Sequence, residues 1–181
     1  HYPVVLEQLA DGLGAVNRFG WWGSNEHGSD DAGDMPTDLA SSPYGALTPI
    51  PDARLTRGPL VREHTLEPGT ALERRWRYDY RAWALTSTRG RGYLGVPETR
   101  VTDSGRGTTT YIQYRLDWPF AGSMAQRRVY MGAPGDSRQE IEREEHRFET
   151  EEGQGAVRRP FVATQARWQL ESGRLVGVDL L

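Results

Sequence analysis

Over three stretches of this chain the side chains alternate between apolar and polar, and this alternation limits the possible folds more than any other feature. The stretches are 72–83, 108–116 and 162–170. Successive side chains of a β-strand point to opposite faces of the sheet, so a period of two predicts strands buried on one face. The alternation therefore predicts a β-protein.

The same period predicts which residues face inward. The inner faces are Leu72, Arg74, Trp76, Tyr78, Tyr80 and Ala82 in the first stretch, Thr110, Ile112, Tyr114 and Leu116 in the second, and Val162, Thr164, Ala166, Trp168 and Leu170 in the third. Asp79 falls on the outer face of the first stretch with Arg75, Arg77 and Arg81. We expect Trp76, Tyr78 and Tyr80 to be more buried than these arginines.

Turn residues separate the predicted strands. Asp11-Gly12-Leu13-Gly14 lies between the apolar runs 2–6 and 15–19, which is typical of a β-hairpin. Residues 103–107 and 132–136 predict two further turns. In Gly90-Arg91-Gly92 we expect a positive φ at a glycine and an ion pair between Arg91 and a carboxylate. Residues 23–59 are rich in Gly, Ser, Asp and Pro, which predicts a long loop.

Residues 138–151 are rich in Glu and Arg, and this composition fits either a helix or a strand. A solvated helix with charge pairs at i,i+4 is one. Their large apolar residues, Ile141 and Phe148, give little support for a helical stripe. We therefore expect a long charged strand.

Composition supports an all-β fold of antiparallel hairpins and meanders. The 21 Gly and 11 Pro are too many for a helical bundle, and apolar residues make up only 36% of the chain. With six Trp and eight Tyr, any core is built largely from aromatic residues. We expect residues 1–59 to form a hairpin and long loop, and residues 60–181 an antiparallel β region, as one unit of a larger protein.

Charge and cysteine content exclude several functional classes. The 22 basic residues are all Arg and face 25 acidic ones, so the net charge of −3 argues against a dedicated nucleic-acid module. The absence of Cys excludes disulfides, zinc-thiolate sites and Cys nucleophiles. No apolar run is long enough for a transmembrane helix.

The sequence offers few groups for catalysis or metal binding. Nucleophile-elbow, phosphate-loop and metalloprotease motifs are absent, and His1, His27, His64 and His146 are scattered. Strand-adjacent carboxylates that could serve a glycosidase are Asp79, Glu98, Asp103 and Asp117, but surface or turn roles are favoured. Calcium could bind the acidic loop through Asp30, Asp31 and Asp34, although the spacing favours a solvated loop. We expect no cofactor and no catalysis.

Aromatic and basic residues offer the remaining binding candidates. Trp76, Trp83, Tyr93 and Trp118 could stack on sugars, but a core role is favoured because aliphatic residues are few. Phosphate could contact Arg89, Arg91, Arg127 and Arg128, yet the acidic total favours ion pairs within the chain.

Three stretches resemble a known family. Leu9 to Phe19, "LADGLGAVNRF", is similar to its "TDGLGA" segment. The stretch from Arg77, "RYDYRAWALTSTRGRGYLGVPETRVTDSGRGTTTYIQYRLDWPFAG", resembles its Y-R-Y, G-R-G-F-L-G-F, V-T-D and T-T-x-Y-R-Q-D-x-P-Y-x-G elements. Arg138 to Leu170 more loosely resembles the charged strand and "PFVA" strand that follow. The family is the shell region of Rhs/YD-repeat proteins, related toxin-complex B components and Salmonella plasmid virulence-type proteins.

This chain departs from the family pattern at identifiable positions. Tyr93 replaces one Phe, Val96-Pro97 replaces another, and Leu116 replaces the Gln. Because Pro97 has no N–H, it fits an edge position or a bulge. The tandem repeats and the self-cleavage motif are not seen, so the resemblance is to the segment that precedes the repeats.

The resemblance implies a scaffold in which β-strands form a hollow cocoon around a separate C-terminal toxin. Gly90, Arg91, Gly92, Leu94 and Gly95 would then be turn and packing residues. The partners would be the rest of the shell, the enclosed toxin and toxin-complex subunits, and the location secreted or at the bacterial cell surface. The alternatives are a carbohydrate- or receptor-binding β module that uses exposed aromatics and, with less support, an enzyme.

Overall fold

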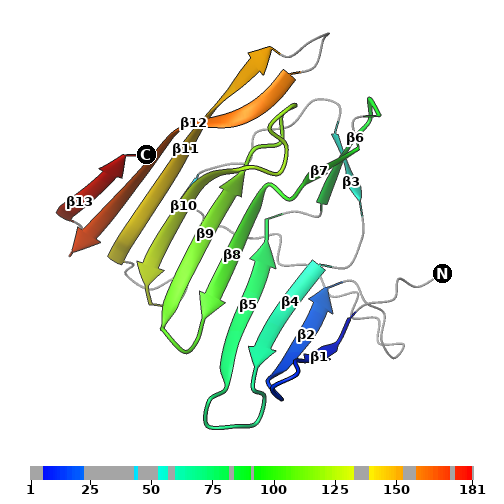
Figure 1. Ribbon diagram of the computed structural model, residues 1–181, viewed down its shortest axis with the longest axis vertical. Coiled ribbons are helices and arrows are strands. Elements are labelled where there is room, and N and C mark those ends of the chain that lie inside the picture. The colour runs from blue at the N-terminus through cyan, green and yellow to red at the C-terminus, as the bar shows by residue number, and fades with distance from the viewer. Residues whose placement is uncertain are drawn as a thin grey trace.

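The computed structural model is an all-β structure built mainly from one large antiparallel sheet (Figure 1). It describes residues 6–22, 43–44, 53–56, 60–81, 84–90, 92–132, 139–152, 158–171 and 174–180. None of these residues lies in a helix. The all-β prediction is therefore confirmed.

The large sheet has ten strands. In spatial order they are β1 (Gln8–Ala10), β2 (Val16–Trp22), β4 (Leu60–Leu66), β5 (Arg74–Tyr80), β8 (Glu98–Asp103), β9 (Thr108–Tyr114), β10 (Met124–Met131), β11 (Gln139–Glu152), β12 (Arg158–Glu171) and β13 (Arg174–Leu180). Neighbours in space are also neighbours in the chain, apart from two excursions after β2 and β5. The sheet is open, because β1 and β13 do not pair with each other.

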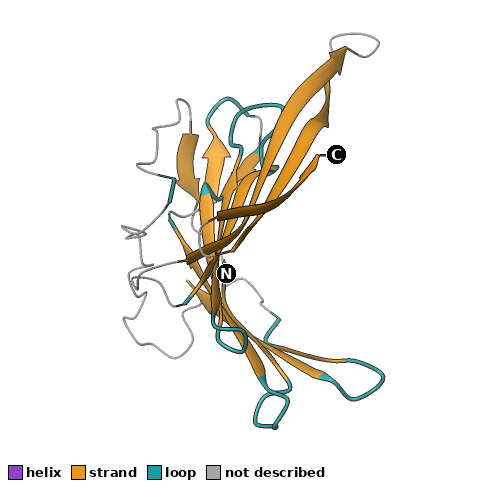
Figure 2. Cartoon of the chain, turned by 90° about the vertical axis from the view of Figure 1, so that its left-hand side faces the viewer, coloured by secondary structure: helices purple, strands orange, loops and turns teal. Residues whose placement is uncertain are grey.

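The two excursions supply a second sheet of three strands, in the order β3 (Ala53–Thr56), β6 (Ala84–Ser87) and β7 (Tyr93–Gly95). Figure 2 shows the large sheet curving, with the small sheet standing on one side of it. β3 lies inside the stretch predicted to be a loop. That prediction is wrong there because Ala53–Thr56 pairs with β6, a contact between residues distant in sequence.

Register assigns side chains to two faces of the large sheet, which we name after Tyr111 and Trp76. Asp79, Arg100, Tyr111 and Arg128 are successive cross-strand partners and share the Tyr111 face. Trp76 lies opposite Asp103 on the Trp76 face.

Burial on the Tyr111 face corrects two predictions. The fully buried residues of β9 are Thr109 and Tyr111, both 0% exposed, whereas the predicted inner face is only half-buried. Asp79, predicted to face outward, is 1% exposed. The expected contrast holds against Arg75 and Arg77, which are exposed while Trp76 and Tyr78 are half-buried and Tyr80 is buried. It fails against Arg81, which is half-buried like Trp76 and Tyr78 because it pairs with the buried Glu98. On these strands the polar side of the alternation is thus the more deeply buried one, which a period of two does not reveal.

Other predicted strands are confirmed with adjusted limits. The long charged segment is a strand, since Glu142 and Glu144 of β11 pair with arginines on neighbouring strands. In the third stretch Ala166 is buried, but Val162 and Thr164 are exposed, and the register shifts beside them. Leu72 is 75% exposed because it belongs to the turn before β5.

The predicted hairpins are present. Asp11 organises the turn between β1 and β2, where its Oδ1 accepts the N–H groups of Leu13 at 2.8 Å and Ala15 at 2.9 Å. The first strand of this hairpin is Gln8–Ala10, later than the predicted run 2–6, of which residues 2–5 lie outside the described ranges. Residues 104–107 join β8 to β9, as predicted. β10 and β11 pair across the third predicted turn, most of which is not described.

Candidate functional site

One row of side chains crosses the Tyr111 face from β5 to β13. Its members are cross-strand partners in succession: Asp79, Arg100, Tyr111, Arg128, Arg143, Trp168 and Val178. The row is charged at its β5 end and apolar at its β13 end. We name it the transverse row, because it runs across the strands of the sheet.

Asp79 is the charged end of the row. Its Oδ2 accepts two hydrogen bonds from Arg100, from Nε at 3.1 Å and from Nη2 at 2.9 Å. Its Oδ1 accepts a third from Nε of Arg77 at 3.2 Å. A buried carboxylate with this set of charge-assisted bonds is held in one geometry, so Asp79 fastens β5 to β8.

A second buried ion pair lies where the chain leaves the large sheet for β6 and returns from β7. Glu98 is 1% exposed, and its Oε2 accepts a hydrogen bond from Nη1 of Arg81 at 3.0 Å. The backbone N–H of Arg81 also donates to the carbonyl of Glu98 at 3.1 Å. The preceding Pro97 is fully buried and lies between β7 and β8, a break that needs no N–H. The pair therefore fixes the base of the second excursion.

Tyr44 covers the middle of the transverse row. Its hydroxyl donates to the backbone carbonyl of Tyr111 at 3.0 Å, and the guanidinium of Arg128 lies 5.3 Å from the centre of its ring. Burial raises the pKa of the Tyr44 hydroxyl well above its usual value, so it remains a donor. Sequence reasoning missed this residue, because it stands alone in a stretch without periodicity.

Aromatic rings stack on the Trp76 face. His64 lies between Phe19 and Trp76, with ring centres 4.8 Å and 4.9 Å apart, and the guanidinium of Arg74 lies 4.9 Å from the Trp76 ring. Nε2 of His64 is 2.9 Å from Oδ1 of Asn17. Burial lowers the pKa of His64. These rings stack on one another, so they form a structural ladder across β2, β4 and β5.

Asp103 ends this ladder as a structural carboxylate. Its Oδ2 accepts hydrogen bonds from Nε1 of Trp76 at 3.1 Å and from Nη2 of Arg74 at 3.3 Å. Its Oδ1 accepts the backbone N–H of Arg106 at 3.0 Å, within the β8–β9 turn. Asp103 thus fixes the turn and one indole rather than a reacting group.

A charged network occupies the same face on β10, β11 and β12. Oε1 of Glu144 lies 2.8 Å from Nε2 of His146 and accepts a bond of the same length from Nε2 of Gln165. Arg127 bridges Glu142 and Glu144, and Arg167 also donates to Glu142. Burial acts to raise the pKa of Glu144, but the hydrogen bond from His146 and the charges of His146 and Arg127 hold that pKa below its usual value.

The sequence-predicted chemical groups are not brought together. His64 lies on β4 and His146 on β11, with four strands between them. Asp117 forms a bidentate pair with Arg115, whose hydrogen bonds hold the pKa of Asp117 low. Asp30, Asp31, Asp34, His1 and His27 lie outside the described residues, as does Arg91. Among the described residues, no group of three or more His, Asp or Glu is arranged to hold a metal ion.

The predictions for the exposed aromatic residues fail, whereas those for the glycines hold. Tyr93 and Trp118 are 63% and 59% exposed, which contradicts their predicted core role; each lies at a strand end or in a turn. Trp83 is not described. Gly90 and Gly92 have φ of 74° and 81°, as predicted, and Gly95 has φ of 95°. Leu94, in β7, is buried.

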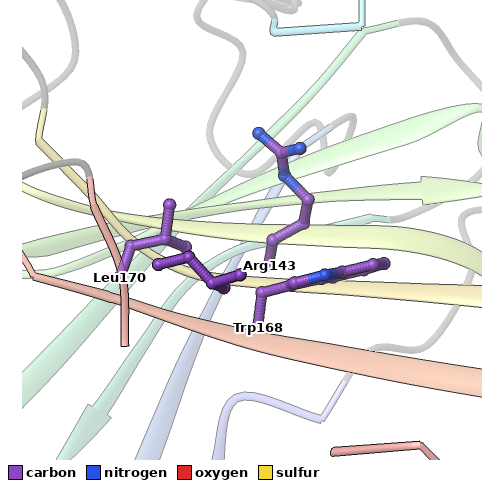
Figure 3. Close-up of a pocket in the computed structure, with 4 residues that line it drawn as sticks. Arg143, Trp168 and Leu170 are labelled. Atoms are coloured by element: carbon purple, nitrogen blue, oxygen red, sulfur yellow. The ribbon is translucent and has the colours of Figure 1, made fainter. Parts of the chain in front are cut away.

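A shallow hollow lies at the apolar end of the transverse row. Arg143, Trp168, Leu170 and Leu175 line a volume of about 240 Å³ (Figure 3). The guanidinium of Arg143 is oriented by Glu140, which accepts bonds from its Nε at 2.8 Å and its Nη2 at 3.0 Å. The hollow therefore has apolar walls with one fixed cation at the rim.

Comparison of this chain with protein-family models, curated proteins and solved structures finds no match in any of the three. The described residues contain no helix that is long and apolar enough to cross a membrane.

Proposed function

We propose that this chain is a non-catalytic wall segment of a hollow β-shell of the Rhs/YD-repeat kind. The observation that carries the proposal is the open ten-stranded meander. On both of its faces, polar side-chain pairs join neighbouring strands. A wall needs such a sheet, because each face meets water or a lumen rather than a deep apolar core. The motif residues Gly90, Gly92, Leu94 and Gly95 act as turn and packing residues in this proposal.

The roles of the candidate catalytic groups support a structural function. Asp79, Glu98, Asp103 and Asp117 each pair with an arginine, and His64 is enclosed in the aromatic ladder. A general acid or base must reach a substrate proton. In this proposal the partners are the rest of the shell, an enclosed toxin domain and toxin-complex subunits, and the location is secreted or at the bacterial cell surface.

A screen of the purified chain tests the proposal against glycan, nucleic-acid, nucleotide and ester substrates, with and without calcium, magnesium or zinc. We expect no turnover. Reproducible turnover that is lost in His64→Ala, His146→Ala or Asp117→Ala would overturn it. The parent reading frame provides a second test, because tandem Tyr-Asp repeats after this segment are expected for a shell.

A second candidate is a carbohydrate-binding module, favoured by the exposure of Tyr93 and Trp118. Sugar stacking needs a free ring face. The ladder around Trp76 does not offer one, so binding would depend on the two exposed rings. Titration with a panel of oligosaccharides distinguishes the two functions: saturable binding lost in Trp118→Ala or Tyr93→Ala supports the module.

A further inference from the structure

The apolar walls of the hollow at the β13 end of the transverse row come from two strands. Trp168 and Leu170 are alternate residues of β12, so they share a face, and Leu175 of β13 is the cross-strand partner of Leu170. The register between β12 and β13 shifts between Gln169 and Leu170, which sets Leu175 rather than Val176 opposite Leu170. Such bulges re-aim side chains and are over-represented next to active sites.

The hollow has room for one small ring. Its volume is about 240 Å³, and a cavity of about 150 Å³ with apolar walls is already large enough to bind benzene. Sites for drug-sized ligands begin at roughly 300 Å³, so the hollow suits a ligand with a single ring. Figure 3 shows Trp168 and Arg143 on one flank of the hollow and Leu170 on the other. A flat ring in this space would contact the indole and both leucines.

Arg143 supplies the polar group at the rim of the hollow. Its Nε and Nη2 donate to Glu140 at 2.8 Å and 3.0 Å, which fixes one edge of the guanidinium. A guanidinium carries five N–H donors, and among the described residues Nη1 of Arg143 has no hydrogen-bond partner. The hydrogen bonds to Glu140 and the charges of Glu140 and Glu145 raise the pKa of Arg143, so it stays a cation. Arg143 therefore offers oriented donors beside the apolar walls.

A second carboxylate on one arginine has a precedent within this sheet. Arg127 bridges Glu142 and Glu144 on the other face. Arg143 has one carboxylate partner among the described residues, so the same arrangement is open to it. Its cross-strand partner Arg128 brings another positive charge to this side of the hollow. A ligand carboxylate would thus meet two neighbouring guanidinium groups.

We propose that the hollow is a binding site for a small aromatic carboxylate. The ring lies against Trp168, Leu170 and Leu175, and the carboxylate accepts hydrogen bonds from Nη1 of Arg143. Charge-assisted hydrogen bonds between arginine and a carboxylate are roughly twice as strong as neutral ones, so the carboxylate decides which aromatic ligands bind. The site goes beyond the proposed function and does not depend on it, because a wall segment and a separate binding module could both carry it.

Isothermal titration calorimetry of the chain with 3-phenylpropionate tests the proposal. We expect saturable binding that Arg143→Gln weakens about tenfold, because a hydrogen bond to a charged group is lost. The neutral 3-phenylpropionamide should also bind about tenfold more weakly than the carboxylate. Arg147→Gln is the matched control, since Arg147 lies on the same strand with a side chain that is 78% exposed, and it does not line the hollow. It should leave the dissociation constant unchanged.

A second variant keeps the test valid if Arg143→Gln disturbs the fold. Leu175→Trp fills the hollow without touching the pair of Arg143 and Glu140, and Leu175 is 58% exposed, so the larger side chain can be accommodated. We expect it to abolish binding, whereas Leu72→Trp, in the turn between β4 and β5, should not. A far-UV circular-dichroism melt establishes that each variant is folded. The proposal is overturned by an absence of saturation at the highest soluble ligand concentration, by binding that survives Leu175→Trp, or by equal affinities for the carboxylate and the amide.

Discussion

At the two ends of the transverse row, burial is the opposite of what side-chain hydrophobicity alone predicts. Asp79 and Arg100 at one end are more deeply buried than Val178 at the other. The charged end is satisfied within the chain, because each oxygen of Asp79 accepts from an arginine. The apolar end has no such internal partner among the described residues. Burial here follows the availability of partners from neighbouring elements as much as side-chain polarity.

The largest effect is expected at the charged end. Asp79→Ala leaves Arg100 without its buried carboxylate, and breaking a buried pair costs about 3–5 kcal/mol of unfolding free energy. Urea denaturation measures the loss. Asp117→Ala is the control, since the exposed pair with Arg115 should contribute only about 0.2–1 kcal/mol. Equal losses at the two positions would show that burial of Asp79 carries no special weight.

A smaller loss is expected on the opposite face. Trp76→Ala removes the stack on His64 and the bond to Asp103. Because Trp76 is half-buried, we expect about 2–3 kcal/mol, less than the roughly 3–5 kcal/mol of a fully buried ring. The same substitution at the exposed Trp118 should change stability by under about 0.5 kcal/mol. A thermal melt unmoved by Trp76→Ala would instead favour a role for this ring in ligand stacking.

The contact of Tyr44 with the middle of the row can be tested by removing one oxygen atom. Tyr44→Phe removes the hydroxyl that donates to the carbonyl of Tyr111, and we expect a loss of about 0.5–1.5 kcal/mol. Tyr93→Phe, at an exposed ring, should have no measurable effect on the denaturation midpoint. If the two variants behave alike, the hydroxyl of Tyr44 does not hold the cover in place.

The smallest effect is the pH dependence contributed by His64. Burial lowers its pKa in the folded chain, so below the unfolded value of about 6.5 the unfolded chain binds a proton that the folded chain resists. Stability should therefore fall as the pH drops from about 6.5 towards the lower folded pKa. The difference between the unmodified chain and His64→Asn, measured by denaturation at each pH, isolates this contribution. A difference independent of pH would contradict the enclosed, neutral imidazole.

Strand identity was largely predictable, since the alternation at 72–83 and 108–116 and the turn at 103–107 are local patterns. The strand 139–152 was also predictable, because its two large apolar residues, Ile141 and Phe148, form no apolar stripe of a helix. The candidate groups were harder to interpret. The sequence identified Asp79 and Asp103 as candidate carboxylates. It did not identify their partners Arg100 and Arg74, because these pairs depend on how the strands align in the sheet.

The sequence by itself determined that this chain forms antiparallel strands and where most of its hairpins turn, because a period of two and turn chemistry act between near neighbours. Only the tertiary structure decided which face is covered. A strand pattern is the same whether its polar side meets water or Tyr44, so the burial of Asp79, Thr109 and Tyr111 could not be read from it. The exposure of Leu175 and Val178 was decided in the same way, by which residues distant in the chain come to lie over the sheet.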